Sequence, residues 1–125
     1  MTPADAAKYA TLAVSMAEKL EGSKLDYSPN SLKSVDEIIL KFHMAGKKPE
    51  DMQRTIIVLG CYVGEVMIRN LGGKWEMPNE KARAIGFSFM GVKTKKENFV
   101  FPIEKSFKRL INGSEDSVFH LYSVV

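Results

Sequence analysis

The chain has 125 residues, of which 45% are hydrophobic and 26% are charged, and its formal net charge is +3. This length and composition predict one globular domain covering residues 1–125 and exclude a disordered chain. The single cysteine, Cys61, excludes an internal disulfide. The longest strongly apolar run without charge, residues 55–64, is about half as long as a membrane-spanning helix. We therefore expect a cytoplasmic protein with no membrane contact.

The first half of the chain predicts three helices. The first covers residues 3–20 and has one apolar stripe, formed by Tyr9, Leu12 or Ala13, Met16 and Leu20. The second starts at Ser28 and Pro29, a cap followed by a first-turn proline, and ends at Gly46. The third covers residues 49–71, and its wide apolar arc is typical of a central helix that touches several neighbours.

The second helix has two distinct faces. Its predicted core face consists of Leu32, Val35, Ile38, Ile39 and Phe42. Its other face carries the charged residues and is expected in water, namely Lys33, Asp36, Glu37 and Lys41.

The second half predicts short strands followed by helices. Trp75–Met77 is one expected strand, and the alternation of Ile85, Phe87 and Phe89 predicts another. A polar loop at residues 93–97 leads to a strand at residues 98–101. Helices are expected at residues 102–112 and from residue 117 to about residue 122. The fold class is therefore α+β, with three N-terminal helices, an antiparallel sheet of two or three strands, and one or two C-terminal helices.

Gly60, Gly64 and Glu65 stand out in the third helix. Glycine inside a helix costs about 1 kcal/mol relative to alanine, so these glycines are interpreted as clearance for close packing, or for a ligand or partner peptide. Glu65 has several alternatives. It forms an ion pair with Arg69 four residues on, pairs with Lys108 or Arg109 of the C-terminal helix, binds a partner, or acts as a general acid or base.

The candidate binding residues surround the end of this helix. Trp75 follows two glycines, which is consistent with a sheet edge or a pocket wall, although tryptophan is usually at least half-buried. The full predicted set is Tyr62, Glu65, Arg69, Trp75, Lys108 and Arg109.

The sequence supplies no catalytic or cofactor motif. His43 and His120 each lack a second histidine or cysteine at metal-ligand spacing, so no metal site is expected. Nucleotide-binding glycine motifs are absent too, because Gly72 and Gly73 follow a helix rather than a strand. We therefore expect no catalytic residue, no metal and no cofactor.

Basic residues are concentrated in one third of the chain. Residues 81–113 contain eight Lys or Arg against two Asp or Glu. Four phenylalanines of this region fit a platform for stacking nucleic-acid bases, but a small sheet must also bury one face, and we interpret them as that core: Phe87, Phe89, Phe99 and Phe101.

Three segments resemble a family of small bacterial cytosolic proteins that is described only as a domain of unknown function. They are Leu25-Asp26-Tyr27-Ser28, Gly60-x-Tyr62-x-Gly64-Glu65 with Arg69-Asn70-x-Gly72-Gly73-x-Trp75, and Lys108-Arg109-Leu110-x-Asn112-Gly113. The resemblance covers roughly residues 20–122 and implies a bacterial origin and an α+β fold. It supplies no activity, cofactor or site residue. By loose analogy, some small domains of this general kind neutralise toxins.

Three hypotheses follow. The leading one is a non-enzymatic module that binds another protein, for example a toxin, through the surface around Tyr62, Glu65, Arg69 and Trp75. The second is a protein that binds nucleic acid or another anionic ligand through residues 81–109. The third is a small enzyme that uses Glu65 with His43 or His120. The oligomeric state is not predicted.

Overall fold

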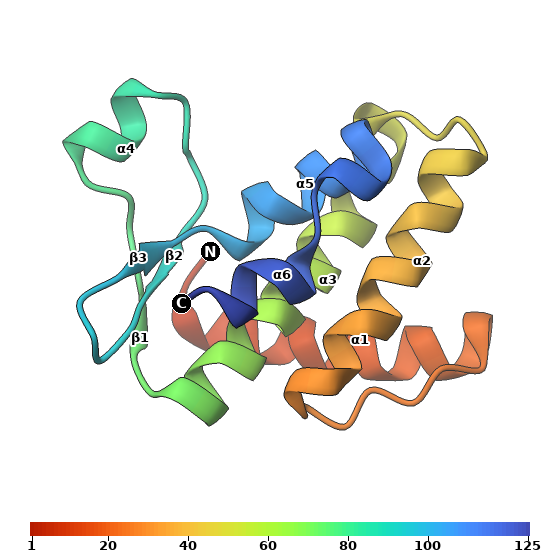
Figure 1. Cartoon of the computed structure of the whole chain (residues 1–125), viewed down its shortest axis with the longest axis horizontal. Helices are drawn as coiled ribbons and strands as arrows, with labels where there is room; N and C mark the ends of the chain where they lie inside the picture. The colour runs from red at the N-terminus through yellow and green to blue at the C-terminus, as the bar shows by residue number, and fades with distance from the viewer.

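A computed structural model describes all 125 residues. Its frame consists of four long helices: α1 (Pro3–Glu21), α2 (Leu32–Met44), α3 (Pro49–Leu71) and α5 (Pro102–Asn112). Helix α3 lies at the centre, packed against α1 and α5, while α2 packs against α5 (Figure 1). The predicted central helix is thus confirmed. None of the helices combines the length and the apolar character needed to cross a membrane.

A small antiparallel sheet stands at one end of the helices (Figure 1). Its strands lie in the order β1 (Lys74–Glu76), β2 (Gly91–Lys93) and β3 (Phe99–Val100), so that β1 and β3 are both edge strands. Trp75 pairs with Val92, which in turn pairs with Val100. The chain is completed by α4 (Glu80–Ala84), α6 (Val118–Ser123) and two short 3₁₀ helices, η1 (Pro29–Ser31) and η2 (Gly113–Glu115). The mixture of helices with a small antiparallel sheet confirms the α+β class.

The predicted apolar stripe of helix α1 is confirmed in part, because Ala13 is buried and Tyr9 and Met16 pack against the core. The core face consists of alanines that are fully buried, namely Ala6, Ala10, Ala13 and Ala17. Leu20, expected on the core stripe, is 72% exposed, and Leu12 is exposed too. The small alanine side chains allow α1 to lie close against α3, and the larger side chains are displaced to the rim of that contact.

Asp36 of α2 is also placed differently from the prediction, because it is only 7% exposed rather than in water. Its carboxylate caps α6: it accepts hydrogen bonds from Ser117 Oγ at 2.6 Å and from the backbone N–H groups of Val118 and Phe119 at 2.8 and 3.2 Å. An acidic group at a helix N-terminus is favourable, and this contact joins α2 to the end of the chain.

The strand predicted at residues 85–89 does not form. Instead, α4 occupies residues 80–84, with Asn79 as its cap, and a loop follows it. The carboxylate of Glu104 accepts hydrogen bonds from the backbone N–H groups of Ser88 and Phe89 at 3.0 and 3.1 Å. These donors would pair with a neighbouring strand in a sheet, so the α5 side chain replaces the strand partner.

Candidate functional site

Trp75 and Glu65 are joined by a hydrogen bond. The indole Nε1–H of Trp75 donates to Glu65 Oε2 at 2.9 Å, and Trp75 is only 6% exposed. Gly64 makes room for this arrangement, since a Cβ at that position would overlap the six-membered ring of Trp75. Glu65 therefore pairs with neither Arg69, Lys108 nor Arg109.

Gly60 serves the same purpose for another element. A Cβ at Gly60 would lie 2.7 Å from the Cα of Ile103, where α5 crosses α3. Such a distance is far below van der Waals contact, so α5 can approach α3 this closely only at a glycine. Gly60 and Gly64 therefore give room to Ile103 and Trp75 of the protein itself, and not to a ligand or a partner peptide.

Tyr62 is fully buried. Its hydroxyl oxygen accepts a hydrogen bond from the backbone N–H of Tyr27 at 2.8 Å and forms a second with Ser31 Oγ at 2.6 Å. Burial raises the pKa of this hydroxyl above its ordinary value. With Tyr62 and Trp75 both inside the protein, the four-residue surface of the leading hypothesis does not form, and Arg69 is its only exposed member.

Arg109, another predicted binding residue, is also buried. Its Nε and Nη2 donate to the backbone carbonyl of Asp36 at 3.3 and 3.2 Å, and its Nη1 donates to the carbonyls of Gly113 and Asp116 at 3.1 and 3.0 Å. Arg109 Nε also lies 3.5 Å from Asp36 Oδ1. Arg109 therefore holds α2, α5 and the C-terminal segment together and has no free face for a partner.

The pair formed by Lys105 and Asp116 gives the protein an acid-sensitive contact. Lys105 Nζ lies 2.7 Å from Asp116 Oδ1, and this hydrogen bond, followed by one from Asn112, holds the pKa of Asp116 below its ordinary value of 3.8. A carboxyl whose pKa is lower in the folded state stabilises the fold above its unfolded pKa, and the stabilisation is lost as the pH falls through the folded value.

We therefore expect the Asp116→Asn variant to show a smaller loss of stability between pH 7 and pH 3 than the wild type. Urea unfolding at both pH values measures this difference. Asp5 and Asp26 also have lowered pKa values, through hydrogen bonds with Thr2 and Ser28, but they titrate in both proteins and cancel in the comparison. An identical pH dependence in the variant would contradict the role of Asp116.

The groups required by the enzyme hypothesis are not assembled. His43 Nδ1 is hydrogen-bonded to the carbonyl oxygen of Leu110 at 2.8 Å, and neither His43 nor His120 forms a hydrogen bond with Glu65. Burial, and secondarily the charge of Glu65, raises the pKa of the Cys61 thiol to about 12. This cysteine is therefore protonated at neutral pH and is a poor nucleophile.

Three phenylalanines form a surface feature that the sequence interpretation assigned to the core. Phe89 does pack on the hydrophobic core, but Phe87, Phe99 and Phe101 lie outside it and are only partly buried. The ring centroid of Phe101 lies 4.4 Å from that of Phe87 and 4.7 Å from that of Phe99. Gly91 provides the room, because a Cβ there would lie 2.5 Å from a ring carbon of Phe99.

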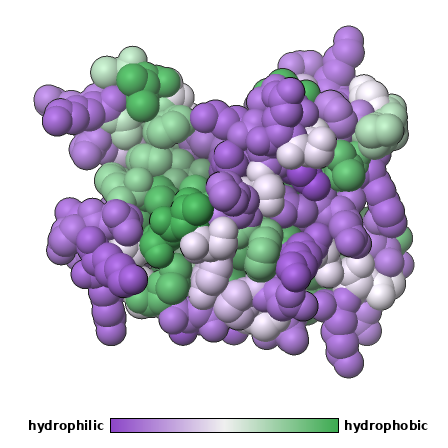
Figure 2. Space-filling view, viewed as in Figure 1, coloured by the Kyte–Doolittle hydropathy of each residue, from purple (hydrophilic) through white to green (hydrophobic).

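These rings line a groove of about 250 Å³ between β3, the loop after α4, and helices α5 and α6, which we call the phenylalanine groove. Its lining residues are Phe87, Phe99, Val100, Phe101, Glu104, Lys105, Lys108 and Leu121. Figure 2 shows an apolar area over this sheet end of the molecule, bordered by hydrophilic side chains. Lys108, the remaining predicted binding residue, is exposed at the groove, with Nζ 5.7 Å from the centre of the Phe87 ring.

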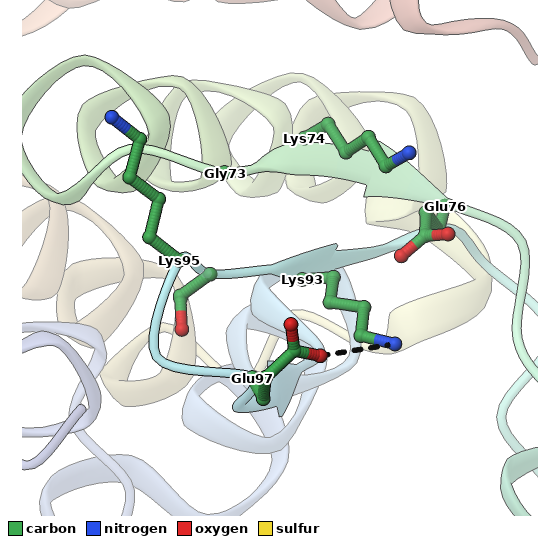
Figure 3. Close-up of a pocket in the computed structure, with 7 residues that line it drawn as sticks. Gly73, Lys74, Glu76, Lys93, Lys95 and Glu97 are labelled. Atoms are coloured by element: carbon green, nitrogen blue, oxygen red, sulfur yellow. Dashed lines mark ion pairs between the residues drawn. The ribbon is translucent and has the colours of Figure 1, made fainter.

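A second hollow, of about 410 Å³, lies over β1 and the β2–β3 hairpin and is lined by charged residues (Figure 3). Lys93 forms an ion pair with Glu97 at 3.4 Å. The Lys95 side chain runs away from Lys74 and Lys93 in Figure 3, and its methylene groups lie over Gly72. Because the three amines do not converge and one is already paired, this hollow is poorly suited to bind an anion.

No family model matches this sequence, and searches of curated proteins and of solved structures find no match either. Among the surfaces of this chain, the phenylalanine groove combines partly buried aromatic rings with the exposed, positively charged Lys108.

Proposed function

We propose that this protein is a non-enzymatic protein-binding module and that its partner docks on the phenylalanine groove. The observation that carries the proposal is the position of Phe87, Phe99 and Phe101, which are only partly buried and are not packed on the core. A contiguous apolar patch rimmed by polar residues is characteristic of interaction sites, and aromatic side chains are enriched in interface cores.

The groove indicates what the partner offers. Its volume of about 250 Å³ lies below the roughly 300–1,000 Å³ of pockets that enclose small molecules, so it suits one or two side chains of a protein. Lys108 carries a positive charge at the groove and forms no ion pair. A partner segment with an aromatic or large aliphatic side chain next to a carboxylate would match both properties, and edge strand β3 could pair with its backbone.

Nucleic acid fits the same surface less well. The rings of Phe87, Phe99 and Phe101 lie against one another and leave limited ring surface for a base. The carboxylate of Glu104 lines the groove, and Lys105 is neutralised by Asp116. The net positive charge of residues 81–109 is thus partly cancelled where a phosphate backbone would have to lie.

A toxin is one partner that these features would suit, by analogy with other small domains that neutralise toxins. We propose a bacterial origin on the basis of the family resemblance, and a cytoplasmic location on the basis of that resemblance and of the short apolar runs.

The test is selection from a random peptide library displayed on phage, followed by affinity measurement with the selected peptides. We expect enrichment of peptides that contain an aromatic residue beside Asp or Glu, and at least a tenfold loss of affinity in the Phe99→Ala variant, as for interface anchor residues. Leu20→Ala is the matched control, because Leu20 is an exposed apolar residue on a different element. It should leave affinity unchanged.

Two outcomes would contradict the proposal. One is that Phe99→Ala and Leu20→Ala lose affinity equally, or that neither of them loses affinity. The other is tight, salt-sensitive binding of mixed-sequence single-stranded RNA or DNA without any peptide selection, which would favour nucleic-acid binding. Because Phe99 lies outside the core, the variant should keep its fold, which circular dichroism can verify.

A further inference from the structure

Tyr27 has an unusual backbone conformation that is held from both sides. Its φ of +64° lies in the left-handed region, which residues other than glycine rarely adopt. Two side chains of α3 fix it: the hydroxyl of Tyr62 accepts from the Tyr27 N–H at 2.8 Å, and Asn70 Nδ2 donates to the Tyr27 carbonyl at 2.9 Å. Such conformations persist only where the surroundings determine them.

This backbone conformation places the Tyr27 ring between two other side chains. On one side, the ring of Tyr62 lies at a centroid distance of 4.9 Å. On another, the guanidinium carbon of Arg69 lies 3.5 Å from the Tyr27 ring centroid, which is close cation–π contact. The position of the Arg69 guanidinium is therefore set before any ligand arrives.

The donors of Arg69 are free. Arg69 is exposed and takes part in none of the ion pairs or side-chain hydrogen bonds of the protein. Its expected helix partner, Glu65, is hydrogen-bonded to Trp75 instead. A stacked guanidinium that retains its fork of N–H donors is suited to bidentate binding of an oxyanion, and its fixed position lowers the entropy cost of binding.

We infer that Arg69, positioned on Tyr27, is a binding site for a carboxylate of a partner protein. A single guanidinium matches the single charge of a carboxylate, whereas phosphate recognition usually requires a cluster of basic residues. Neither Arg69 nor Tyr27 lines the phenylalanine groove. Carboxylate binding at Arg69 can therefore be tested separately from partner binding at the groove.

The test is an NMR titration of the arginine Nε–Hε resonances with a capped triglutamate peptide at low ionic strength. Arg54 is the internal control: it is exposed on the same helix but contacts no ring and forms no ion pair. We expect the Arg69 resonance to saturate at a peptide concentration at least fivefold lower than that of Arg54. Equal responses would overturn the inference.

Two further measurements test whether the Tyr27 ring is required for binding and whether Arg69 prefers a carboxylate to phosphate. Tyr27→Leu should reduce the Arg69 response to that of Arg54, while Tyr27→Phe, which keeps the ring, should preserve it. If Tyr27→Leu does not fold, the comparison of Arg69 with Arg54 in the wild type still tests whether Arg69 binds the carboxylate. In a parallel titration, inorganic phosphate should bind Arg69 more weakly than the peptide does, and tighter binding of phosphate would overturn the assignment to a carboxylate.

Discussion

Replacing Arg109 with methionine is expected to lower the free energy of unfolding by about 3–5 kcal/mol, the range for removing one partner of a buried ion pair. The guanidinium donates to three backbone carbonyls and lies 3.5 Å from Asp36 Oδ1. Methionine fills similar space but supplies no donor, so these carbonyls lose their hydrogen bonds in a largely buried region. Urea unfolding followed by circular dichroism measures the change.

The matched control is Lys41→Met, which breaks the ion pair between Lys41 and Glu21. That pair also has good geometry, at 3.0 Å, but the Lys41 side chain is 67% exposed, so the expected loss is below about 1 kcal/mol. Asp36→Ala should destabilise strongly as well, and the double variant with Arg109→Met should lose less than the sum of the two. A loss below about 1 kcal/mol in Arg109→Met would show that this network contributes little.

Helix bounds were the part of the fold that local chemistry could predict. Helix α3 was predicted at residues 49–71 and lies at Pro49–Leu71, and α5 was predicted at residues 102–112 and lies at Pro102–Asn112. Each begins at a proline and is followed by a glycine. Proline fixes φ at the first turn of a helix, and glycine after the last turn allows the positive φ that ends it, whatever the rest of the chain does.

Burial was predicted less well where it depends on distant partners. Asp36 lies on the face of α2 that the sequence pattern assigns to water, and only the approach of Arg109 and the start of α6 makes that face internal. Asp36 and Arg109 are 73 positions apart along the chain. The expected strand at residues 85–89 failed for a similar reason, because Glu104 satisfies the backbone donors of that segment.

The candidate site shows the same limit. Glu65 could be identified as unusual from sequence, but its acceptor role toward Trp75 depends on how β1 turns back over α3. For the phenylalanines, the alternation of Phe99 and Phe101 indicated a shared face without saying whether that face is covered. The strands that form have only two or three residues, and a sheet this small does not bury every ring. The sequence pattern predicts longer strands, which is why the rings were assigned to the core.

Gly64→Ala is the second substitution with a large expected effect, a loss of about 2–4 kcal/mol from overpacking and from the broken hydrogen bond between Trp75 and Glu65. Alanine favours helix over glycine by about 1 kcal/mol, which opposes the loss but does not outweigh it. The new methyl group would overlap the Trp75 ring, which has to move outward. Because Trp75 is the only tryptophan, its fluorescence emission should shift to longer wavelength.

Gly60→Ala distinguishes this mechanism from a general disturbance of α3. Its methyl group would press on the backbone of Ile103 at 2.7 Å instead, so it should destabilise the protein while leaving the emission of Trp75 unchanged. A Gly64→Ala variant with wild-type emission and raised stability would mean that helix propensity dominates and that Trp75 does not lie on α3. The paired result, destabilisation in both variants with an emission shift in only one, would place Trp75 against Gly64 and support the assignment of both glycines to packing rather than to a binding site.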